Sequence, residues 1–447
     1  MYYNRTEEEL NLQFQGVPPN SIATNGAGTD GGSPGFANPF VDIAGRSNFN
    51  VPNPFPFTGA PSNVQFTAAN GYLPIWSACC STIDPRNVDP TSYNYNLTIE
   101  RQVTASTIAS VGYVGSFARH LEIGHPLNLV NPAPCIAAGP NVCSPGNQLT
   151  TFPQDYLYPG NIYGTIDQIS TFGNSHYNSL QAGLKKKLSK GLQFTANYTW
   201  SHSFDNGSGF ENTSFGGGGF GGLSATRAYN PYLPASNFGS SIFDARNRLV
   251  IGYVYELPHP RTGNGLLNRA TKGWTISGIT TFQSGFPMDV IDSSAWSLRD
   301  YPGNSDFATI DVPNIVAPVQ YQNPRKTNGS TGVAQWFSTT PFVGYCPTNG
   351  NAPGCVPAGS FGNSPRNVLH GPGINNWDFQ LFKDTNITET TRLELRIEFY
   401  NVFNHENFWA GGIVNNVAAP NFGQAIADNP STGQGPRLIQ LAAKFYF

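Results

Sequence analysis

Charged residues are scarce in this chain of 447 residues. They make up 11% of it, against about 25% in ordinary soluble domains, which argues against a typical soluble enzyme. The net charge is only −3 and no long block of like charges occurs, so a nucleic-acid partner is not expected. Intrinsic disorder is equally unexpected, because 13% of the residues are aromatic and disordered chains have few aromatics.

Long apolar runs are also absent. No stretch approaches the ~18 consecutive apolar residues of a transmembrane helix, and the mean hydropathy is −0.29. A membrane β-barrel remains compatible with these values, because its strands alternate between two faces and give a weak hydropathy signal. The segment from Met1 to Glu9 has no basic region followed by an apolar core, so it is not a signal peptide. We therefore expect either a protein that is not exported or a chain that begins inside a longer one.

Recognisable catalytic motifs are missing as well. The sequence contains no nucleophile elbow, Walker loop, HExxH motif or Rossmann fingerprint. His202 and Asp205 could suggest an acid–base pair, but one pair without a third group has little diagnostic value. We therefore predict no enzyme, no cofactor and no metal site.

Six cysteines are present, two pairs of them in turn-rich segments. Cys135 with Cys143, and Cys346 with Cys355, predict small loop-closing disulfides of an oxidising compartment. The alternative is unpaired or metal-binding thiols, although no His or Cys stands nearby at zinc-site spacing. The pairing of the adjacent Cys79 and Cys80 cannot be read from the sequence.

What the sequence does contain is alternation of period two. Leu192–Ser201 alternates apolar and polar residues without a break, and Leu180–Leu188 before it alternates nearly as well. The short turn at Ser189-Lys190-Gly191 makes the two a β-hairpin. Their length suits the about 9–11 residues of a strand that crosses a bilayer. The basic run Lys185–Lys187 lies near the turn, where it could pair with lipid phosphates or with acids of a lumen.

The same alternation recurs at 94–100, 109–113, 249–255, 274–278 and 392–399. In the last of these, charged residues occupy one face and large apolar residues the other, which places water on one side and lipid or a core on the other. If the apolar face meets lipid, the charged face points into a barrel lumen, and we expect cross-strand ion pairs there. The charged residues are Arg392, Glu394, Arg396 and Glu398.

Long stretches without any period separate the hairpins, at 123–160, 203–241 and 292–373. Loops beyond about 12–15 residues are uncommon in compact domains. Short turns at one end of the strands and long loops at the other are typical of outer-membrane barrels. Trp200, Trp274 and Trp377 fit interfacial aromatic girdles, or alternatively the core of a β-sandwich. Substrate contacts are expected from the loops at Phe210–Tyr232 and Ser293–Trp336.

The C-terminal segment Arg437–Phe447 alternates up to a terminal aromatic residue. It resembles the assembly signal of bacterial outer-membrane barrels, which the barrel-assembly machinery would recognise by β-augmentation. The matching positions are Gln440, Ala442, Phe445 and Phe447. Ala442 departs from the glycine that is usual at its place.

Several further stretches carry a family resemblance. They are Tyr95–Arg101, Tyr113–Gly115, Tyr177–Gln181, Asn197–Ser203, Phe243–Arg248 and Glu394–His405. In this order they resemble the C-terminal barrel half of TonB-dependent receptors, in particular the Oar-like group, from about Tyr93 to Phe447.

The resemblance implies an all-β, antiparallel transmembrane barrel segment with long extracellular loops. This chain has about ten to twelve candidate strands, whereas a receptor barrel of this kind has about 22. Neither the plug nor the TonB-contacting box of such receptors is found. We expect a loop-rich part over 1–92 with one or two barrel strands, and barrel strands and loops over 93–447. The economical explanation is a truncated gene product or a partial reading frame.

By this resemblance the protein lies in the outer membrane and contacts its lipid. TonB and a plug would be partners only of the full-length parent, which would take up an oligosaccharide, a siderophore or a peptide. The alternative is a secreted or cell-surface β-sandwich adhesin or carbohydrate-binding protein. The side chains Leu192, Phe194, Ala196, Tyr198 and Trp200 discriminate the two, because a second sheet would cover them in a sandwich and nothing would in a barrel.

Overall fold

The computed structural model describes residues 2–3, 81–126, 131–139, 142–145, 167–208, 230, 233, 237–259, 265–299, 311–346, 352–426 and 435–447. Cys79, Cys80, nearly all of the loop Phe210–Tyr232 and most of the part over 1–92 lie outside these residues.

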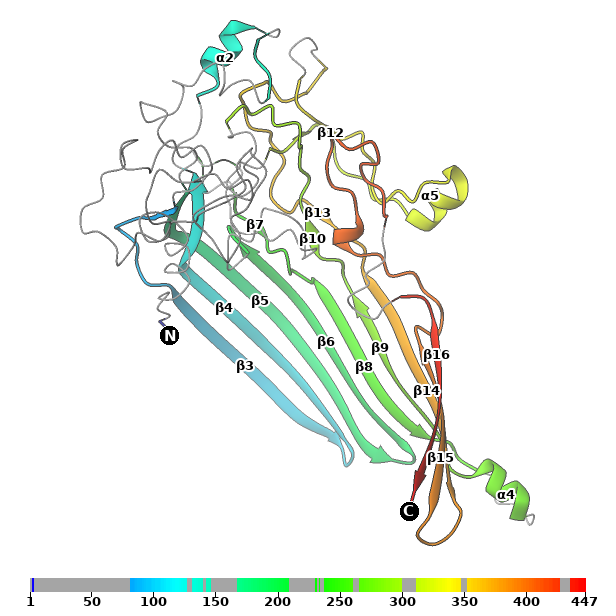
Figure 1. The fold of residues 1–447 in the computed structure, drawn as a ribbon. Coiled ribbons are helices and arrows are strands. Elements are labelled where there is room, and N and C mark those ends of the chain that lie inside the picture. The colour runs from blue at the N-terminus through cyan, green and yellow to red at the C-terminus, as the bar shows by residue number, and fades with distance from the viewer. Residues whose placement is uncertain are drawn as a thin grey trace, which may run out of the picture.

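One large sheet of 12 strands dominates the described residues. Nine of its strands are long, and each pairs antiparallel with the next along the chain (Figure 1). They are β3 (Thr91–Thr104), β4 (Thr107–Pro126), β5 (Asp167–Ser189), β6 (Leu192–Asp205), β8 (Asn247–Glu256), β9 (Trp274–Gln283), β14 (Ile374–Asn386), β15 (Arg392–Tyr400) and β16 (Leu438–Tyr446). The prediction of an all-β antiparallel barrel segment is confirmed.

Three short strands complete the sheet. β1 (Tyr2–Tyr3) pairs with β3, β7 (Gly239–Ser240) pairs with β6, and β2 (Ser81–Ile83) runs parallel to β5. Among the described residues, β16 pairs only with β15, and β3 has only the two-residue β1 on its outer side. Over the described part of the chain, the sheet is curved but not closed (Figure 1).

The two ends of the strands differ as the sequence predicted. Three hairpin turns are short at one end, the turn end, whereas the connections after β9 and β15 are long at the other. In the turn between β5 and β6, Lys190 and Gly191 have φ values of 53° and 78°. Positive φ at both central residues is what a two-residue type I′ turn requires. The connection of β8 to β9 carries a short helix, α4 (Gly265–Thr271), at this same end (Figure 1).

The long connections pack together into a body that we call the loop cap, formed by the described residues of 284–373 and 401–426. It contains the two-stranded pairs β10 (Pro287–Met288) with β13 (Leu369–His370) and β11 (Asn314–Ile315) with β12 (Phe342–Val343). Helix α5 (Pro324–Thr331) and the single turn η5 (Ala410–Gly412) lie in it as well. Its buried apolar cluster is Met288, Val290, Phe337, Phe342, Leu369, Ala410, Ile413, Phe422 and Ala425. The described residues of the aperiodic stretch 292–373 are therefore part of a packed body.

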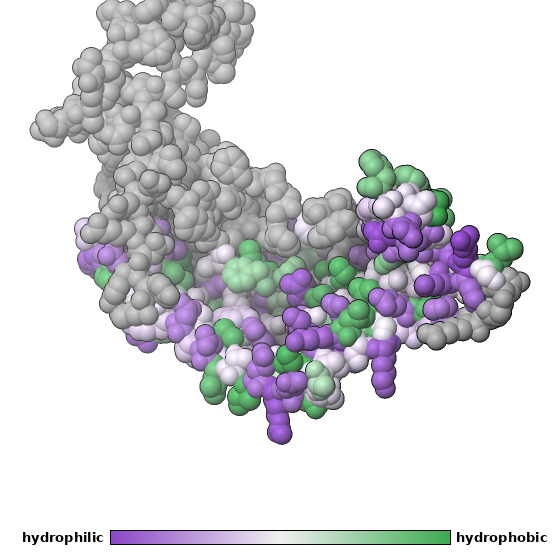
Figure 2. Space-filling view, turned by 90° about the horizontal axis from the view of Figure 1, so that it is seen from below, coloured by the Kyte–Doolittle hydropathy of each residue, from purple (hydrophilic) through white to green (hydrophobic). Residues whose placement is uncertain are grey.

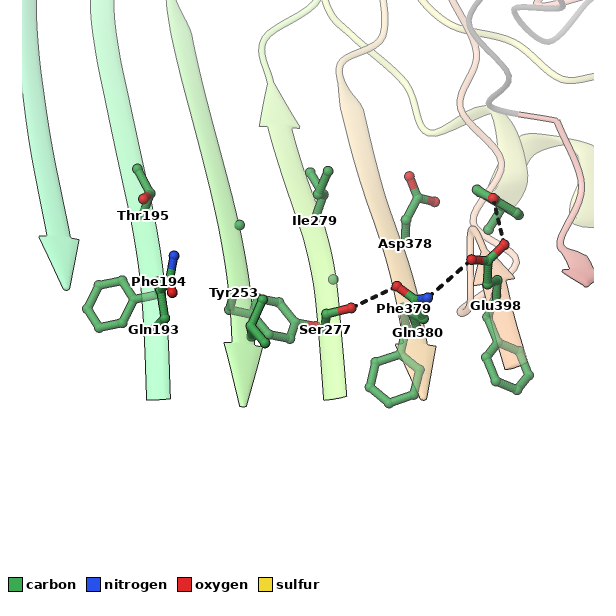
Figure 3. Close-up of a pocket in the computed structure, with 15 residues that line it drawn as sticks. Gln193, Phe194, Thr195, Tyr253, Ser277, Ile279, Asp378, Phe379, Gln380 and Glu398 are labelled. Carbon is green, nitrogen blue, oxygen red and sulfur yellow. Dashed lines mark hydrogen bonds between the residues drawn. The ribbon is translucent and has the colours of Figure 1, made fainter. Parts of the chain in front are cut away.

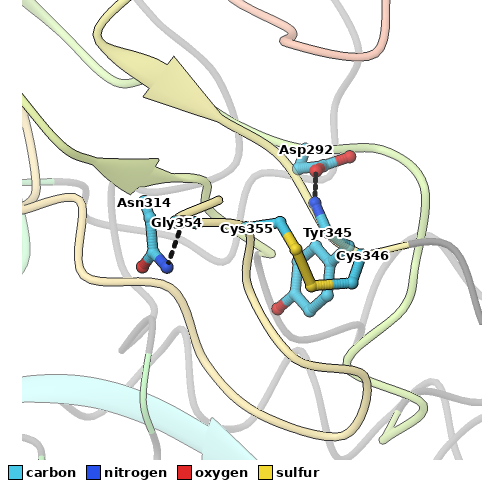
Figure 4. The surroundings of a disulfide bond; sticks show 6 residues. All are labelled: Asp292, Asn314, Tyr345, Cys346, Gly354 and Cys355. Carbon is cyan, nitrogen blue, oxygen red and sulfur yellow. Dashed lines mark hydrogen bonds between the residues drawn. A yellow bond between two sulfur atoms is a disulfide. The ribbon is translucent and has the colours of Figure 1, made fainter. Parts of the chain in front are cut away.

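Both predicted disulfides are present in the structure. Cys135 of helix α2 (Ala133–Ala138) forms a disulfide with Cys143, which follows the helix. Both cysteines pack against Leu298 of the loop cap. Cys346 bonds Cys355 beside Tyr345, whose backbone N–H donates to Asp292 (Figure 4). Each bond closes a short loop and limits the freedom of the unfolded chain.

None of the helices in the described part of the chain is both long and apolar enough to cross a membrane.

Candidate functional site

The register of the sheet places apolar residues on one face across every long strand. One row runs through Leu192, Tyr255, Ile276, Leu381, Ile397 and Leu441. Another row runs through Ile99, Val111, Ala182, Tyr198, Leu249 and Phe282. We call this side the outward face.

The apolar side chains of the outward face are not covered by a second layer of the described chain. None of Leu192, Phe194, Ala196, Tyr198 and Trp200 is buried, and Trp200 is 58% exposed. Leu97 and Leu441 are 68% and 74% exposed. The other sheets among the described residues have two strands each and belong to the loop cap, so no second layer covers these side chains. The sandwich alternative is therefore wrong for this chain, since a sandwich hides one face of each sheet.

The opposite, polar face is organised by a chain of hydrogen bonds across three strands (Figure 3). Ser277 of β9 donates to Gln380 of β14 at 2.8 Å, and the Gln380 amide donates to Glu398 of β15 at 3.2 Å. A hollow of about 440 Å³ lies along this row, with Thr195 and Asp378 among its polar lining. Such fixed donors and acceptors are suited to a wet interior or to a polar ligand.

The charged residues of β15 all lie on this polar face, but their ion pairs differ from the prediction. Arg396 contacts Glu394 at 2.6 Å and Glu398 at 3.3 Å, both within its own strand. Only Arg392 pairs across strands, with Asp384 at 3.6 Å. The expectation of cross-strand pairs was thus mostly wrong.

The neighbours of Arg396 explain this difference. The residues opposite it are Phe382 on β14 and Ala442 on β16, neither of which is acidic. The Arg396 guanidinium lies 5.7 Å from the Phe382 ring centroid. The nearest carboxylates on this face are therefore those two positions away along β15, because alternate residues of a strand share a face.

His202 pairs with a residue other than the nearby Asp205. Its Nδ1 lies 2.8 Å from Asp244, which also accepts from Arg246 Nε at 2.8 Å. Asp205 instead binds Arg366 of the loop cap at 2.6 Å, and both side chains are almost fully buried. His202 and Asp205 therefore do not pair with each other, and the partner of His202 comes from the sequence stretch just before β8.

The loop cap is fastened to the strand ends at this point. Arg366 also donates to the backbone carbonyl of Asp205, and the Asn367 side-chain amide donates to the backbone carbonyl of Ser240 in β7. Arg366 is fully buried although 161 residues separate it from Asp205. No local sequence pattern distinguishes it from an ordinary loop arginine, so sequence reasoning missed it.

The pKa values of Asp84 and His370, which both lie outside the nine long strands, depart from their ordinary values. Hydrogen bonds from Arg86 hold the pKa of Asp84 at about 2. Burial lowers the pKa of His370 from its ordinary 6.5, and the charge of Arg246 lowers it further. His370 lies in β13, above the strand ends.

The register of the last strand, β16, places the residues of the expected assembly signal on both faces of the sheet. Gln440 and Ala442 stand opposite Glu398 and Arg396 on the polar face, and Phe445 stands opposite Leu393 on the outward face. Phe447 follows the strand and is 98% exposed. Among the described residues, no group of three or more His, Cys, Asp or Glu side chains could hold a metal ion.

Comparison with known proteins agrees with this arrangement. The family model described as "Outer membrane beta barrel domain" matches residues 1–440. The chain belongs to this family, and it is an outer-membrane protein, as predicted. No curated protein matches the sequence.

The solved structures that match this chain include the outer membrane transporter YddB from Escherichia coli, at 9% identity and a TM-score of 0.37, over 81% of this chain and 33% of that one. The pyoverdine receptor FpvA from Pseudomonas aeruginosa has 12% identity and a TM-score of 0.32, over 81% and 30%. The FrpB iron transporter from Neisseria meningitidis has 10% identity and a TM-score of 0.33, over 82% and 32%. The chain thus spans about a third of the length of these structures.

Proposed function

We propose that this chain forms the C-terminal barrel part of a TonB-dependent receptor that takes up an external nutrient, and that it is not an enzyme. The observation that carries this proposal is the division of one sheet into a bare apolar face and a hydrogen-bonded polar face. A barrel wall needs both, because lipid solvates one side and water the other. The resemblance of the sequence to the Oar-like group supports the same assignment.

In this proposal the polar face lines the lumen. The row Ser277, Gln380 and Glu398 and the charges of β15 would then face the interior that a plug fills in a complete receptor. TonB would act on that plug, and the barrel-assembly machinery would pair with β16. Gln440, Ala442, Phe445 and Phe447 are the proposed recognition residues.

The loop cap is the proposed site of first contact with the nutrient. Its described part includes an aromatic pair, Tyr321 and Trp336, with ring centroids 5.8 Å apart. Trp336 donates from its indole to the His370 carbonyl at 2.9 Å, which fixes the ring. Aromatic rings with neighbouring polar groups suit sugars, aromatic siderophores and peptides alike, so the substrate stays within these three classes.

Uptake measurements on intact cells test the proposal. Cells that lack the gene of the complete receptor are compared with complemented cells for accumulation of labelled ferric siderophores, oligosaccharides and peptides. We expect energy-dependent accumulation of one class to disappear with the gene. Deletion of residues 311–346 in the complete receptor should weaken binding of that same substrate. Equal accumulation of every class in both strains would overturn the proposal.

A further inference from the structure

A groove lies on the outward face at the turn end of the sheet. Its volume is about 510 Å³, and its lining includes Lys186, Lys190, Leu192, Tyr255 and Ile276. The row Leu192, Tyr255 and Ile276 belongs to the outward face by register. The groove therefore has an apolar, aromatic floor beside two ammonium groups.

Basic residues at this end of the sheet occur on both faces, with Lys185 and Arg392 on the polar face. Arg101, Lys186 and Lys383 lie in register with outward-facing residues, Ala109, Phe194 and Leu395 respectively. The acidic residues of the same strand segments lie on the polar face. They are Glu100, Glu256, Asp384 and Glu394. The outward face at the turn end is thus basic, and an anion approaching it meets no carboxylate from these positions.

The lysines at the turn end differ in how many of their ammonium protons already form hydrogen bonds within the protein. Lys383 donates to the carbonyls of Arg269, Ala270 and Lys272 at 2.7–3.1 Å, which uses all three ammonium protons to hold the end of α4. Lys186 donates to one acceptor among the described residues, Ser106 at 3.2 Å. Lys190 is exposed in the type I′ turn. Lys186 and Lys190 therefore retain donors for a ligand.

We propose that this groove binds an anionic phospholipid of the periplasmic leaflet. The lipid phosphate lies between Lys186 and Lys190, and the glycerol and the first acyl carbons lie on Tyr253, Tyr255 and Ile276. Two observations select a lipid: the apolar floor, and the position at the end of the sheet that bears the short turns, which face the periplasm in outer-membrane barrels. Seen from this end, hydrophobic and hydrophilic side chains interleave over the described surface (Figure 2).

The inference rests on the outward face meeting lipid and is independent of the transported substrate. The test uses this chain of 447 residues in micelles of a neutral detergent, with a photoactivatable phosphatidylglycerol as the probe and the phosphatidylcholine analogue as reference. Labelled peptides are located by mass spectrometry. We expect phosphatidylglycerol to label the peptide that contains Tyr253 and Tyr255 in preference to phosphatidylcholine.

Matched variants distinguish the loss of a positive charge in the groove from a general effect of the substitution on folding. Lys186→Gln and Lys190→Gln should each reduce the labelling by about fivefold, the effect of one basic residue near an anionic lipid surface. Lys185→Gln should leave it unchanged, because Lys185 stands opposite Thr195 on the polar face. Lys186→Arg should retain it.

Three results would overturn the proposal. Equal labelling by the two lipids, or equal losses with Lys185→Gln and Lys186→Gln, would reduce the groove to an apolar patch. Competition by inorganic phosphate as effective as that by unlabelled phosphatidylglycerol would show a site for a soluble anion instead.

Discussion

At the scale of single residues, the most consequential contact is the buried ion pair of Arg366 and Asp205. Its side chains are 0% and 3% exposed. Replacing Arg366 with methionine should destabilise the loop cap by about 3–5 kcal/mol, because it leaves a buried carboxylate without its counter-charge. Denaturant unfolding followed by tryptophan fluorescence measures the loss. The double variant Arg366→Met with Asp205→Leu should recover most of it, and a double variant as unstable as the single one would contradict this reading.

We expect His370 to make the stability of the loop cap depend on pH. Burial, followed by the charge of Arg246, lowers its pKa below the ordinary 6.5. Between the folded-state value and 6.5 the unfolded chain binds more protons, so stability falls as the pH drops through 6.5 and levels off below the folded-state pKa. The hydrogen-exchange protection of residues 366–371, after correction for the intrinsic exchange rate at each pH, should therefore decrease on acidification. His370→Gln should flatten this dependence, and an unchanged profile in that variant would contradict the assignment.

At the scale of elements, the strands were predictable because alternate residues of a strand share a face. A sheet with one apolar and one polar face therefore shows a period of two in the local sequence. A slip of one residue would turn Leu381 inward and Gln380 outward, so the register is strongly specified. The loop cap was not predictable. Its core joins Met288, Phe337, Leu369 and Phe422 from distant, aperiodic stretches, and the pairing of Asp244 with His202 depends on two strand ends meeting in space.

The two faces of β14 provide a test of the same element. Leu381 lies on the outward face and Gln380, its neighbour, on the polar face. Leu381→Lys should destabilise the protein by up to about 2–4 kcal/mol, the upper value being that of the bilayer midplane, because an ammonium would enter hydrocarbon. Gln380→Lys introduces the same charge on the wet side and should cost far less. Retention of the complete receptor in urea-washed outer membranes measures both, and equal retention of the two variants would contradict the assignment of the faces.

At the scale of the whole molecule, the open sheet determines what the chain can do alone. Among the described residues, β16 leaves its outer edge unpaired and β3 is covered only by the two residues of β1. A bilayer does not accept lipid-exposed strand edges, since their N–H and C=O groups find no partners there. We therefore predict that the purified chain, added to planar bilayers, gives no defined pore and instead associates through its edges. Single-channel recording and size-exclusion chromatography measure the two outcomes. A reproducible unitary conductance from this chain would show that it closes by itself or as an ordered oligomer, and the assignment as part of a larger wall would then fail.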